Sequence, residues 1–392
     1  MTQTADVIII GGGVMGTSIA FHLARRKAGK VLLLEKSWLG AGSSGKSGAN
    51  IRQHYSHPLL LRMAQSGLRM FEQFTDIVEG PPVFTRCGMV VVAPGSERDS
   101  LAANVAMQQE RGVKTSLVSR EELRSIDPQA ALEDDEVAAF ESEAGHCEAL
   151  RVVASFASAA SRLGAEIHEG VAVERIEVEG GRVSGVSTSQ GFLSSRNVVM
   201  AAGPWSASVA RSAGVAIPVQ PCRTQVALVR RPADFSGPHP TYADLVHHTY
   251  FRAIAGEITH LGNIDTREER AIVDPDDYNE VVDREFVTEV RAKLNRRYPS
   301  VRRGVGRGGF SALYSITPDW NPIIGRLPGV EGAFCAAGFS GHGFKMSPAV
   351  GELITEMVID GSARSFDIGP LRANRFNEGD PFPTKGEYNV MG

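Results

Sequence analysis

Three glycines and one acid near the N-terminus have the clearest chemical meaning in this sequence. Gly11, Gly13 and Gly16 follow the apolar run Val7–Ile10 in the spacing G-x-G-x-x-G, and Glu35 follows a second apolar run. In this pattern the first glycine permits a tight turn, the second lets a pyrophosphate approach the backbone, and the third lets a helix pack closely on a strand. Glu35 can take both ribose hydroxyls, which disfavours a 2′-phosphate. The pattern predicts a site for the ADP half of NAD or FAD.

The elements predicted around these residues place them for that chemistry. Val7–Ile10 and Val31–Leu34 predict short buried strands, and residues 15–28 predict a helix rich in Ala, Leu, Ile and Phe. The N-terminus of such a helix offers unpaired N–H groups and a positive dipole to phosphates. The complete unit of strand, turn, helix, strand and acid is a stronger signal than the glycine spacing alone.

A second glycine-rich loop lies near the C-terminus. The apolar run 334–337 breaks into Gly338, Gly341 and Gly343, and Ser347 with Pro348 predicts a helix that has Ser347 as its N-cap. Such a loop, directed into a helix N-terminus, stabilises negative charge, which reduced FAD carries on the N1/O2 edge of its isoalloxazine. NAD needs no second loop of this kind. The feature favours FAD, with an NAD-dependent dehydrogenase as the alternative.

Length and composition are consistent with an enzyme. The 392 residues are 42% hydrophobic and 22% charged, which predicts a substantial core in two domains or one large one. The net charge of −4 argues against nucleic acid or an anionic membrane as the main partner. The cysteines lack metal-ligand spacing, so we expect reduced thiols, a cytoplasmic location and no metal site. Because the first strand begins at Val7, we expect no signal peptide, and no apolar run predicts a membrane span.

The rest of the pattern alternates helices and strands. Gly180 and Gly181 predict a hairpin turn, and Gly203 follows the buried strand 198–201 in a small-residue turn suited to a second close approach to a cofactor. Residues 221–303 predict a strand-rich insertion that covers a site, and the segment after Asp367 predicts an irregular tail. Further helices are expected at residues 59–78, 101–111, 150–163 and 283–298, and further strands at 85–93, 171–178, 183–188, 225–229, 249–253, 257–261, 323–325 and 334–337.

Four segments carry a family resemblance that spans nearly the whole chain: GGGVMGTSIAFHLARR, NVVMAAGPW, TPDWNPIIG and AAGFSGHGFKMSPAVGE. In this order they resemble the D-amino-acid oxidase superfamily of FAD-dependent oxidoreductases, in particular its sarcosine oxidase and glycine oxidase branch. The resemblance implies a two-domain α/β flavoprotein with a Rossmann-type FAD-binding domain and a mostly antiparallel substrate domain. We expect the FAD-binding domain at residues 1–82, 146–220 and 305–392, and the substrate domain at 83–145 and 221–304.

The resemblance also implies a reaction. It is the oxidation of a small amino acid, most plausibly an N-alkyl or cyclic secondary amine such as sarcosine or a proline derivative. A hydride passes from the carbon next to nitrogen to flavin N5, and water hydrolyses the resulting imine. The electrons then go to O₂ or another acceptor. One alternative remains from the heteromeric relatives: a β-type flavin-binding subunit that acts only with a partner subunit.

Site residues carry over at matching positions. Arg52 and Lys345 resemble the pair that binds the substrate carboxylate, and Tyr55 and Tyr314 are candidates for the pocket lining. By motif, His342 lies beside the flavin. The residues assigned to FAD contact by the motifs and the resemblance are Gly11, Gly13, Val14, Met15, Gly16, Glu35, Lys36, Ser43, Ser44, Lys46, Ser47, Val173, Ala202, Gly203, Trp205, Gly341, Gly343, Phe344 and Lys345.

Three features depart from the relatives. Ala312 stands where some relatives attach FAD through a cysteine, and the loop GSSGKSG lacks the histidine that others use, so we expect noncovalent FAD. His260 falls where good oxidases place an oxygen-activating lysine. A histidine is mostly neutral at pH 7, and Arg52 and Lys345 nearby would lower its charged fraction further. The sequence therefore favours a slow oxidase or a dehydrogenase.

Overall fold

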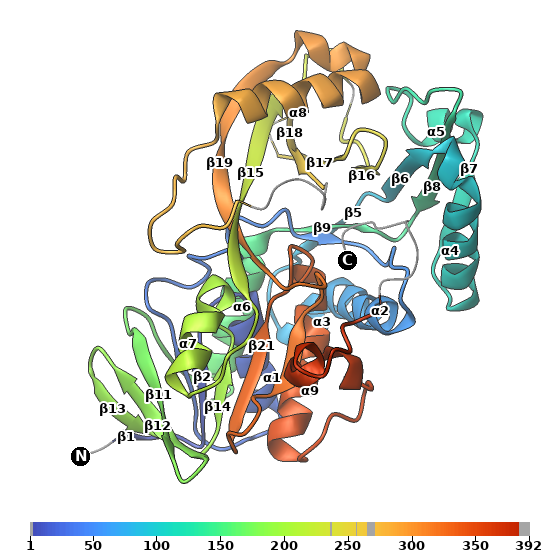
Figure 1. Ribbon diagram of the computed structural model, residues 1–392. Coiled ribbons are helices and arrows are strands. Elements are labelled where there is room, and N and C mark those ends of the chain that lie inside the picture. The colour runs from blue at the N-terminus through green and yellow to red at the C-terminus, as the bar shows by residue number, and fades with distance from the viewer. Residues whose placement is uncertain (1–2, 236, 256, 265–270, 384–392) are drawn as a thin grey trace.

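The computed structural model describes residues 3–235, 237–255, 257–264 and 271–383 of the chain. It is a two-domain α/β structure with a mostly parallel six-stranded sheet at one end and a mostly antiparallel eight-stranded sheet at the other (Figure 1). This arrangement confirms the predicted fold class, whereas the residue boundaries of the domains stay a prediction. None of the helices in the described part of the chain has the length and apolar composition that a membrane crossing requires.

The six-stranded sheet contains the predicted nucleotide-binding unit. Its strand order is β10–β3–β2–β14–β21–β20, and neighbouring strands are parallel except for β21 with β20. The strands are β2 (Val7–Ile10), β3 (Val31–Leu34), β10 (Glu166–His168), β14 (Val198–Met200), β20 (Ile323–Arg326) and β21 (Ala333–Ala337).

Both faces of this sheet are covered, as a parallel sheet requires. Ile9 and Leu33 lie in a core shared with α1 (Val14–Arg25), α2 (Pro58–Glu72), α3 (Phe74–Val78), α6 (Ala149–Arg162) and α9 (Ser347–Ile359). Ile8 and Leu32 lie in a second core with α7 (Ser206–Ser212) and a four-stranded sheet. The strands of that sheet, in spatial order, are β1 (Gln3–Thr4), β13 (Gly191–Ser194), β12 (Arg182–Thr188) and β11 (Val173–Glu179).

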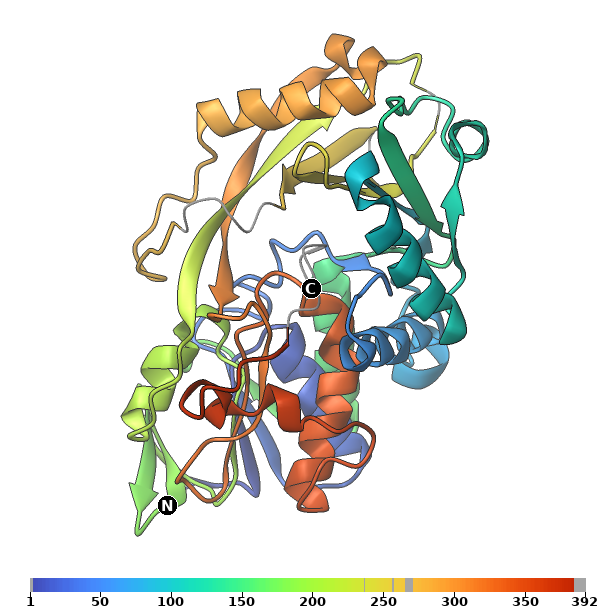
Figure 2. The ribbon, with the colours of Figure 1, turned by 45° about the vertical axis from the view of Figure 1, so that its right-hand side comes forward.

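The eight-stranded sheet has helices on both faces. Helix α8 (Arg284–Arg297) packs on one face through Val290 and Leu294, and Figure 2 shows it across the top of the sheet. Leu123 of α5 (Arg120–Ile126) joins the same core, whereas Leu101 of α4 (Arg98–Glu110) packs on the other face. The strands, in spatial order, are β19 (Val305–Ile316), β15 (Gln220–Arg230), β18 (Ile258–Asn263), β17 (Thr249–Ile254), β16 (Thr241–Asp244), β6 (Met89–Pro94), β8 (Glu136–Glu141) and β7 (Thr115–Val118).

Two connections tie the sheets together. Strands β15 and β19 form a long antiparallel ribbon, paired from Gln220 with Ile316 to Arg230 with Val305, and both views show it running from one sheet to the other (Figures 1 and 2). A small sheet of β4 (Asn50–Ile51), β9 (Gly145–Cys147) and β5 (Phe84–Arg86) lies between them. The ribbon fixes how the two sheets face one another.

The glycine turn has the packing that the sequence predicts. Gly11 adopts φ +109°, and a Cβ there would lie 2.5 Å from the carbonyl oxygen of Ala201. A Cβ at Gly16 would lie 1.8 Å from the carbonyl oxygen of Gly11. Neither position can hold a larger residue without moving β14 or α1 away from the turn, since such distances are far inside van der Waals contact.

Several predicted elements differ in detail. The helix expected at 59–78 is divided between α2 and α3 at Gln73, and the strand expected at 85–93 is divided between β5 and β6 by Gly88, which adopts φ +75°. Strand β16 was not predicted. The assignment of Ser347 as an N-cap is wrong, because a 3₁₀ turn at Phe344–Met346 runs directly into α9 and makes Met346 the cap residue.

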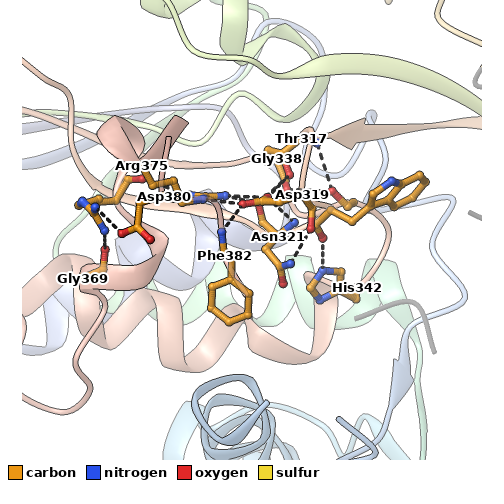
Figure 3. Close-up of polar contacts among 12 residues, drawn as sticks. Thr317, Asp319, Asn321, Gly338, His342, Gly369, Arg375, Asp380 and Phe382 are labelled. Carbon is orange, nitrogen blue, oxygen red and sulfur yellow. Dashed lines mark hydrogen bonds and ion pairs between the residues drawn. The ribbon is translucent and has the colours of Figure 1, made fainter. Parts of the chain in front are cut away.

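The C-terminal tail is held by one buried acid. Figure 3 shows Asp319 at the centre of this cluster, where it accepts hydrogen bonds from Arg375 Nε at 2.8 Å and Arg375 Nη2 at 3.0 Å. The same carboxylate accepts from the backbone N–H of Phe382 at 2.9 Å. The predicted irregular tail thus contains two 3₁₀ turns, Gly369–Leu371 and Ala373–Phe376, and its last part, 384–392, lies outside the described residues.

The Asp319–Arg375 pair generates a stability prediction. Arg375 and Asp319 side chains are 0% and 6% exposed, so Arg375→Met leaves a buried carboxylate without its cation and should cost about 3–5 kcal/mol of unfolding free energy. The control is Arg182→Met, which breaks the exposed pair with Glu331 and should cost less than about 1 kcal/mol. Urea unfolding measures both. Equal losses would contradict the role assigned to the buried pair.

Candidate active site

The turn between β2 and α1 presents backbone donors at the carboxyl edge of the parallel sheet. The N-cap residue of α1 is Gly13, which has no side chain that could cap the helix. The N–H of Val14 donates to Ser44 Oγ at 2.9 Å, and a Cβ at Gly13 would lie 3.0 Å from that oxygen. Glu35 Oε2 accepts from the N–H of Gly12 at 2.7 Å. A helix N-terminus behind a glycine that permits close approach, with a serine hydroxyl beside it, fits the pyrophosphate of a dinucleotide.

The loop after Glu35 is held by acids from the insertion. Lys36 Nζ lies 3.8 Å from the ring centroid of Trp205, and Asp276 accepts hydrogen bonds from Lys36 Nζ at 2.6 Å and Trp205 Nε1 at 2.9 Å. Lys46 Nζ donates to Glu280 Oε2 at 2.5 Å. Lys36 and Lys46, two of the three lysines predicted to contact FAD, are therefore held by the segment 274–280, which joins the insertion to the nucleotide edge.

The other predicted FAD contacts gather near the same edge. Ser43 Oγ donates to the carbonyl of Leu313 on β19 at 2.6 Å, and Ser47 Oγ accepts from the N–H of Ala49 at 3.0 Å. Ala202 and Gly203 lie just beyond the end of β14, while Val173 begins β11 and packs against the second core. Met15 is buried in the first core. Gly11, Glu35 and Ala202 follow β2, β3 and β14, the edge at which open parallel sheets bind ligands.

The C-terminal glycine loop brings His342 and Tyr55 together. A Cβ at Gly341 would lie 2.7 Å from the ring of Tyr314, so the loop is pressed against β19. The ring of His342 hydrogen-bonds through Nε2 with the carbonyl of Trp320 at 3.0 Å (Figure 3) and through Nδ1 with Tyr55 Oη at 3.4 Å. Burial lowers the pKa of His342 to about 3 and raises that of Tyr55 to about 12. Both side chains are therefore neutral near pH 7.

Two further members of the loop pack beneath it. A Cβ at Gly343 would lie 2.6 Å from Phe339, so this position cannot hold a larger side chain. The ring of Phe344 stacks on Phe71 of α2 with centroids 6.1 Å apart. These contacts fix the start of α9 against α2.

The two predicted carboxylate-binding cations converge on one aromatic ring. The guanidinium of Arg52 lies 4.5 Å and Lys345 Nζ lies 5.8 Å from the ring centroid of Tyr55. Arg52 is 7% exposed and Lys345 is 4% exposed. Arg52 donates to the carbonyl of His54, and Lys345 Nζ donates to the carbonyl of His342 at 3.2 Å. Burial, and then the charge of Arg52, lower the pKa of Lys345 well below its usual value.

A buried acid that sequence reasoning missed lies beside these cations. Glu141, at the end of β8, accepts hydrogen bonds from the backbone N–H of Gln53 at 2.8 and 3.1 Å and from Gln53 Nε2 at 3.1 Å. Burial raises the pKa of Glu141 to about 7, although Gln53 and Arg52 oppose the rise. Glu141 stands among several acids in residues 133–143. The sequence around it therefore does not distinguish it from carboxylates that lie at the surface.

His260 has different neighbours from those expected. Burial and the charge of Arg252 lower its pKa to about 3, which makes it neutral as predicted, but the cation beside it is Arg252 rather than Arg52 or Lys345. His260 Nε2 lies 3.4 Å from Tyr250 Oη, and Tyr250 in turn hydrogen-bonds with Tyr314. Sequence reasoning did not identify Tyr250 and Arg252 as neighbours of His260. They lie in β17, next to the strand that holds His260, and strand register decides which side chains meet there.

The fold has the architecture of a dinucleotide-dependent oxidoreductase. Its parallel sheet carries one glycine turn for the ADP half of a dinucleotide, and a second glycine loop lies beside buried cations. The family comparison makes the class specific. The chain belongs to the family described as FAD-dependent oxidoreductase (DAO), which it matches over residues 6–357. The cofactor of the family is FAD, which decides against the NAD-dependent alternative. The glycine turn and the N-terminus of α1 fit this cofactor.

Several relatives of the chain are named for the oxidation of an amino acid or amine. The 4-methylaminobutanoate oxidase (formaldehyde-forming) of Paenarthrobacter nicotinovorans is 29% identical over 94% of this chain, which spans only 45% of that relative's length. Human peroxisomal sarcosine oxidase is 28% identical over 95% of this chain and 96% of its own. The crystal structure of L-proline dehydrogenase from P. horikoshii superimposes with a TM-score of 0.89 at 25% identity, covering 97% of this chain and all of the other. The chain is an FAD-dependent enzyme of the family that oxidises amino acids and amines.

Glu141 generates a pH prediction. Its carboxyl has a pKa of about 7 in the folded chain against 4.5 for an ordinary glutamate, so the folded state holds a proton that the unfolded state releases. The stability this provides is present below pH 4.5 and is lost as the pH rises through about 7. In Glu141→Gln the side chain at position 141 cannot titrate. Over this pH range the unfolding free energy of the variant should therefore fall by on the order of 3 kcal/mol less than that of the parent chain.

Urea unfolding at a series of pH values measures this difference. The control is Glu174→Gln on an exposed position of β11, which should keep the slope of the parent chain. Superimposable pH profiles for Glu141→Gln and the parent would show that Glu141 does not take up a proton on folding.

Proposed function

We propose that this chain oxidises a small amino acid whose nitrogen is a secondary amine, either N-alkylated or part of a ring. The observation that carries the proposal is the convergence of two buried cations, Arg52 and Lys345, on Tyr55 beside the glycine loop. The names of the relatives support the substrate class, because 4-methylaminobutanoate, sarcosine and proline are all secondary amines that carry a carboxylate.

In this proposal the side chains bind and orient the substrate. Arg52 holds the carboxylate and Lys345 adds a second positive charge, which together fix the position of the carbon next to nitrogen. Bound FAD supplies the chemistry by accepting a hydride equivalent from that carbon. Tyr55, Tyr314 and His342 stay neutral and limit the access of water. The buried site strengthens the attraction between the cations and the carboxylate, because the local dielectric is low.

The substrate class is tested by anaerobic reduction of the flavin. The isolated, FAD-loaded chain is mixed with sarcosine, dimethylglycine, L- and D-proline, pipecolate, glycine and primary D-amino acids, and the flavin absorbance is followed. Loss of absorbance with secondary amines and not with primary ones is the expected result. Reduction by the isolated chain would also show that no partner subunit is needed, a point that stays a prediction. Reduction by primary amino acids alone would overturn the proposal.

We also propose that FAD is held without a covalent bond. Ala312, at the position where some relatives attach the cofactor, is buried in β19 and has no group that could form such a bond. Acid precipitation should release all the flavin into the supernatant as FAD. Flavin that stays with the precipitated protein would contradict this.

The role of Arg52 is tested by substitution. Arg52→Met should weaken binding of the carboxylate by roughly 2–5 kcal/mol, which is a 30-fold or larger rise in the substrate Kd, and Arg52→Lys should recover part of it. The control is Arg62→Met at an exposed position of α2, which should leave the Kd unchanged. Stopped-flow reduction of the flavin gives Kd separately from the limiting rate. An unchanged Kd in Arg52→Met would remove Arg52 from the carboxylate site.

A further inference from the structure

A second buried arginine has no acid paired with it among the residues that the structure describes. Arg252, in the middle of β17, is 6% exposed, and its buried Nε and Nη1 atoms have no hydrogen-bond partner among the described residues. Two fully buried arginines elsewhere behave differently: Arg297 pairs with Glu136 and Asp244, and Arg375 pairs with Asp319. Burying a guanidinium with unmade hydrogen bonds is costly, so such a group signals a missing ligand.

The groups around Arg252 are polar but bear little negative charge. His260 stands opposite it in the register of β17 and β18, and His146 on β9 is near enough for the charge of Arg252 to lower its pKa. Burial lowers the pKa of both histidines far enough to leave them neutral at pH 7. Glu148, the nearby carboxylate that favours the charged form of Arg252, is exposed, where solvent screens it.

The same place has other unsatisfied polar atoms. His146 Nδ1 and Asn50 Oδ1, which belong to paired positions of β9 and β4, are buried without partners among the described residues. The side chains of Asn50 and His260 both face Gly48, since a Cβ at Gly48 would lie 3.6 Å from Asn50 Nδ2 and 3.7 Å from His260 Cε1. A ligand at this place would therefore meet hydrogen-bonding groups as well as a positive charge.

A continuous run of contacts connects Arg252 to the proposed carboxylate site. His260, beside Arg252, lies 3.4 Å from Tyr250 Oη, and Tyr250 hydrogen-bonds with Tyr314. The ring of Tyr314 lies against Gly341, directly before His342, whose ring contacts Tyr55. These contacts join Arg252 to the proposed carboxylate site by way of Tyr250, Tyr314 and the glycine loop.

We infer that Arg252, with His146, Asn50 and His260 around it, forms a second anion-binding subsite, and that the substrate carries two acidic groups. The first carboxylate binds at Arg52 and Lys345, and the second binds at Arg252. The substrate class is then an amino dicarboxylic acid or an amino acid whose nitrogen bears a carboxyalkyl group. This inference rests on the proposed function, because it takes the site of the first carboxylate from it.

The test measures equilibrium binding of acids that cannot be oxidised. FAD-loaded protein is titrated with acetate and propionate, and with malonate, succinate and glutarate, and Kd is obtained from the change in flavin absorbance. In the parent chain at least one dicarboxylate should bind tenfold or more tightly than the monocarboxylates. Arg252→Gln should raise the Kd of that dicarboxylate by a factor at least tenfold larger than the factor for acetate. Arg252→Lys should recover part of this difference.

Controls separate the possible outcomes. Arg231→Gln alters an arginine of equal exposure and should keep the preference for dicarboxylates. Its Nε, like that of Arg252, has no partner among the described residues, but its Nη1 donates to the carbonyl of Ile258 and to Thr259 Oγ1. Flavin content and thermal midpoint identify a variant that fails to fold, in which case Arg252→Lys decides. If Arg252→Gln weakens the binding of mono- and dicarboxylates equally, or weakens the binding of neither, the inference of a second subsite is overturned.

Substrate turnover distinguishes this inference from the proposed function. If sarcosine and iminodiacetate both reduce the flavin but Arg252→Gln does not change their ratio of kcat/KM, the second subsite is wrong and the proposed function stands. If no secondary amine reduces the flavin of the parent chain, the proposed function itself fails.

Discussion

The antiparallel ribbon of β15 and β19 is the constraint on which the rest of the site depends. Its strands pair without a break in register from Gln220 with Ile316 to Ala227 with Gly309. This continuous pairing fixes the position of the parallel sheet relative to the antiparallel one. The carbonyls of Leu313 and Ser311 on β19 accept hydrogen bonds from Ser43 and Lys46 of the nucleotide loop. A slip of one residue would turn every side chain of the ribbon to the other face, and Tyr314 would leave the glycine loop.

Charge burial explains why this interior suits an anion. Arg52, Lys345 and Arg252 are all buried, and Glu141 is the buried acid whose charge acts on the first two. Its pKa of about 7 leaves it only partly ionised at neutral pH, so it cannot balance both cations. A carboxylate from a ligand would supply the missing negative charge and would recover much of the cost of desolvating the cations.

Distant segments hold the C-terminal glycine loop in place. Asp319 pairs with Arg375 of the tail and accepts from the N–H of Phe382, which fixes the turn at Trp320. The carbonyl of Trp320 then holds His342, and His342 contacts Tyr55. The order of the loop depends on Arg375 and Phe382, which lie 33 and 40 positions after His342 in the sequence, because a glycine-rich loop has little conformational preference of its own.

The sequence by itself determined the features whose cause is local. Val7–Ile10, the glycine turn and Val31–Leu34 could be predicted because β-branched runs and glycine spacing set backbone conformation over a few residues, and the hairpin at Gly180 follows the same logic. Only the tertiary structure decided the rest. Glu141 and Arg252 look like surface charges in the sequence, His260 was given the wrong cationic neighbour, and Ser347 the wrong role at α9. Burial and charge neighbours arise from strands paired across the fold, and local sequence does not encode those distances.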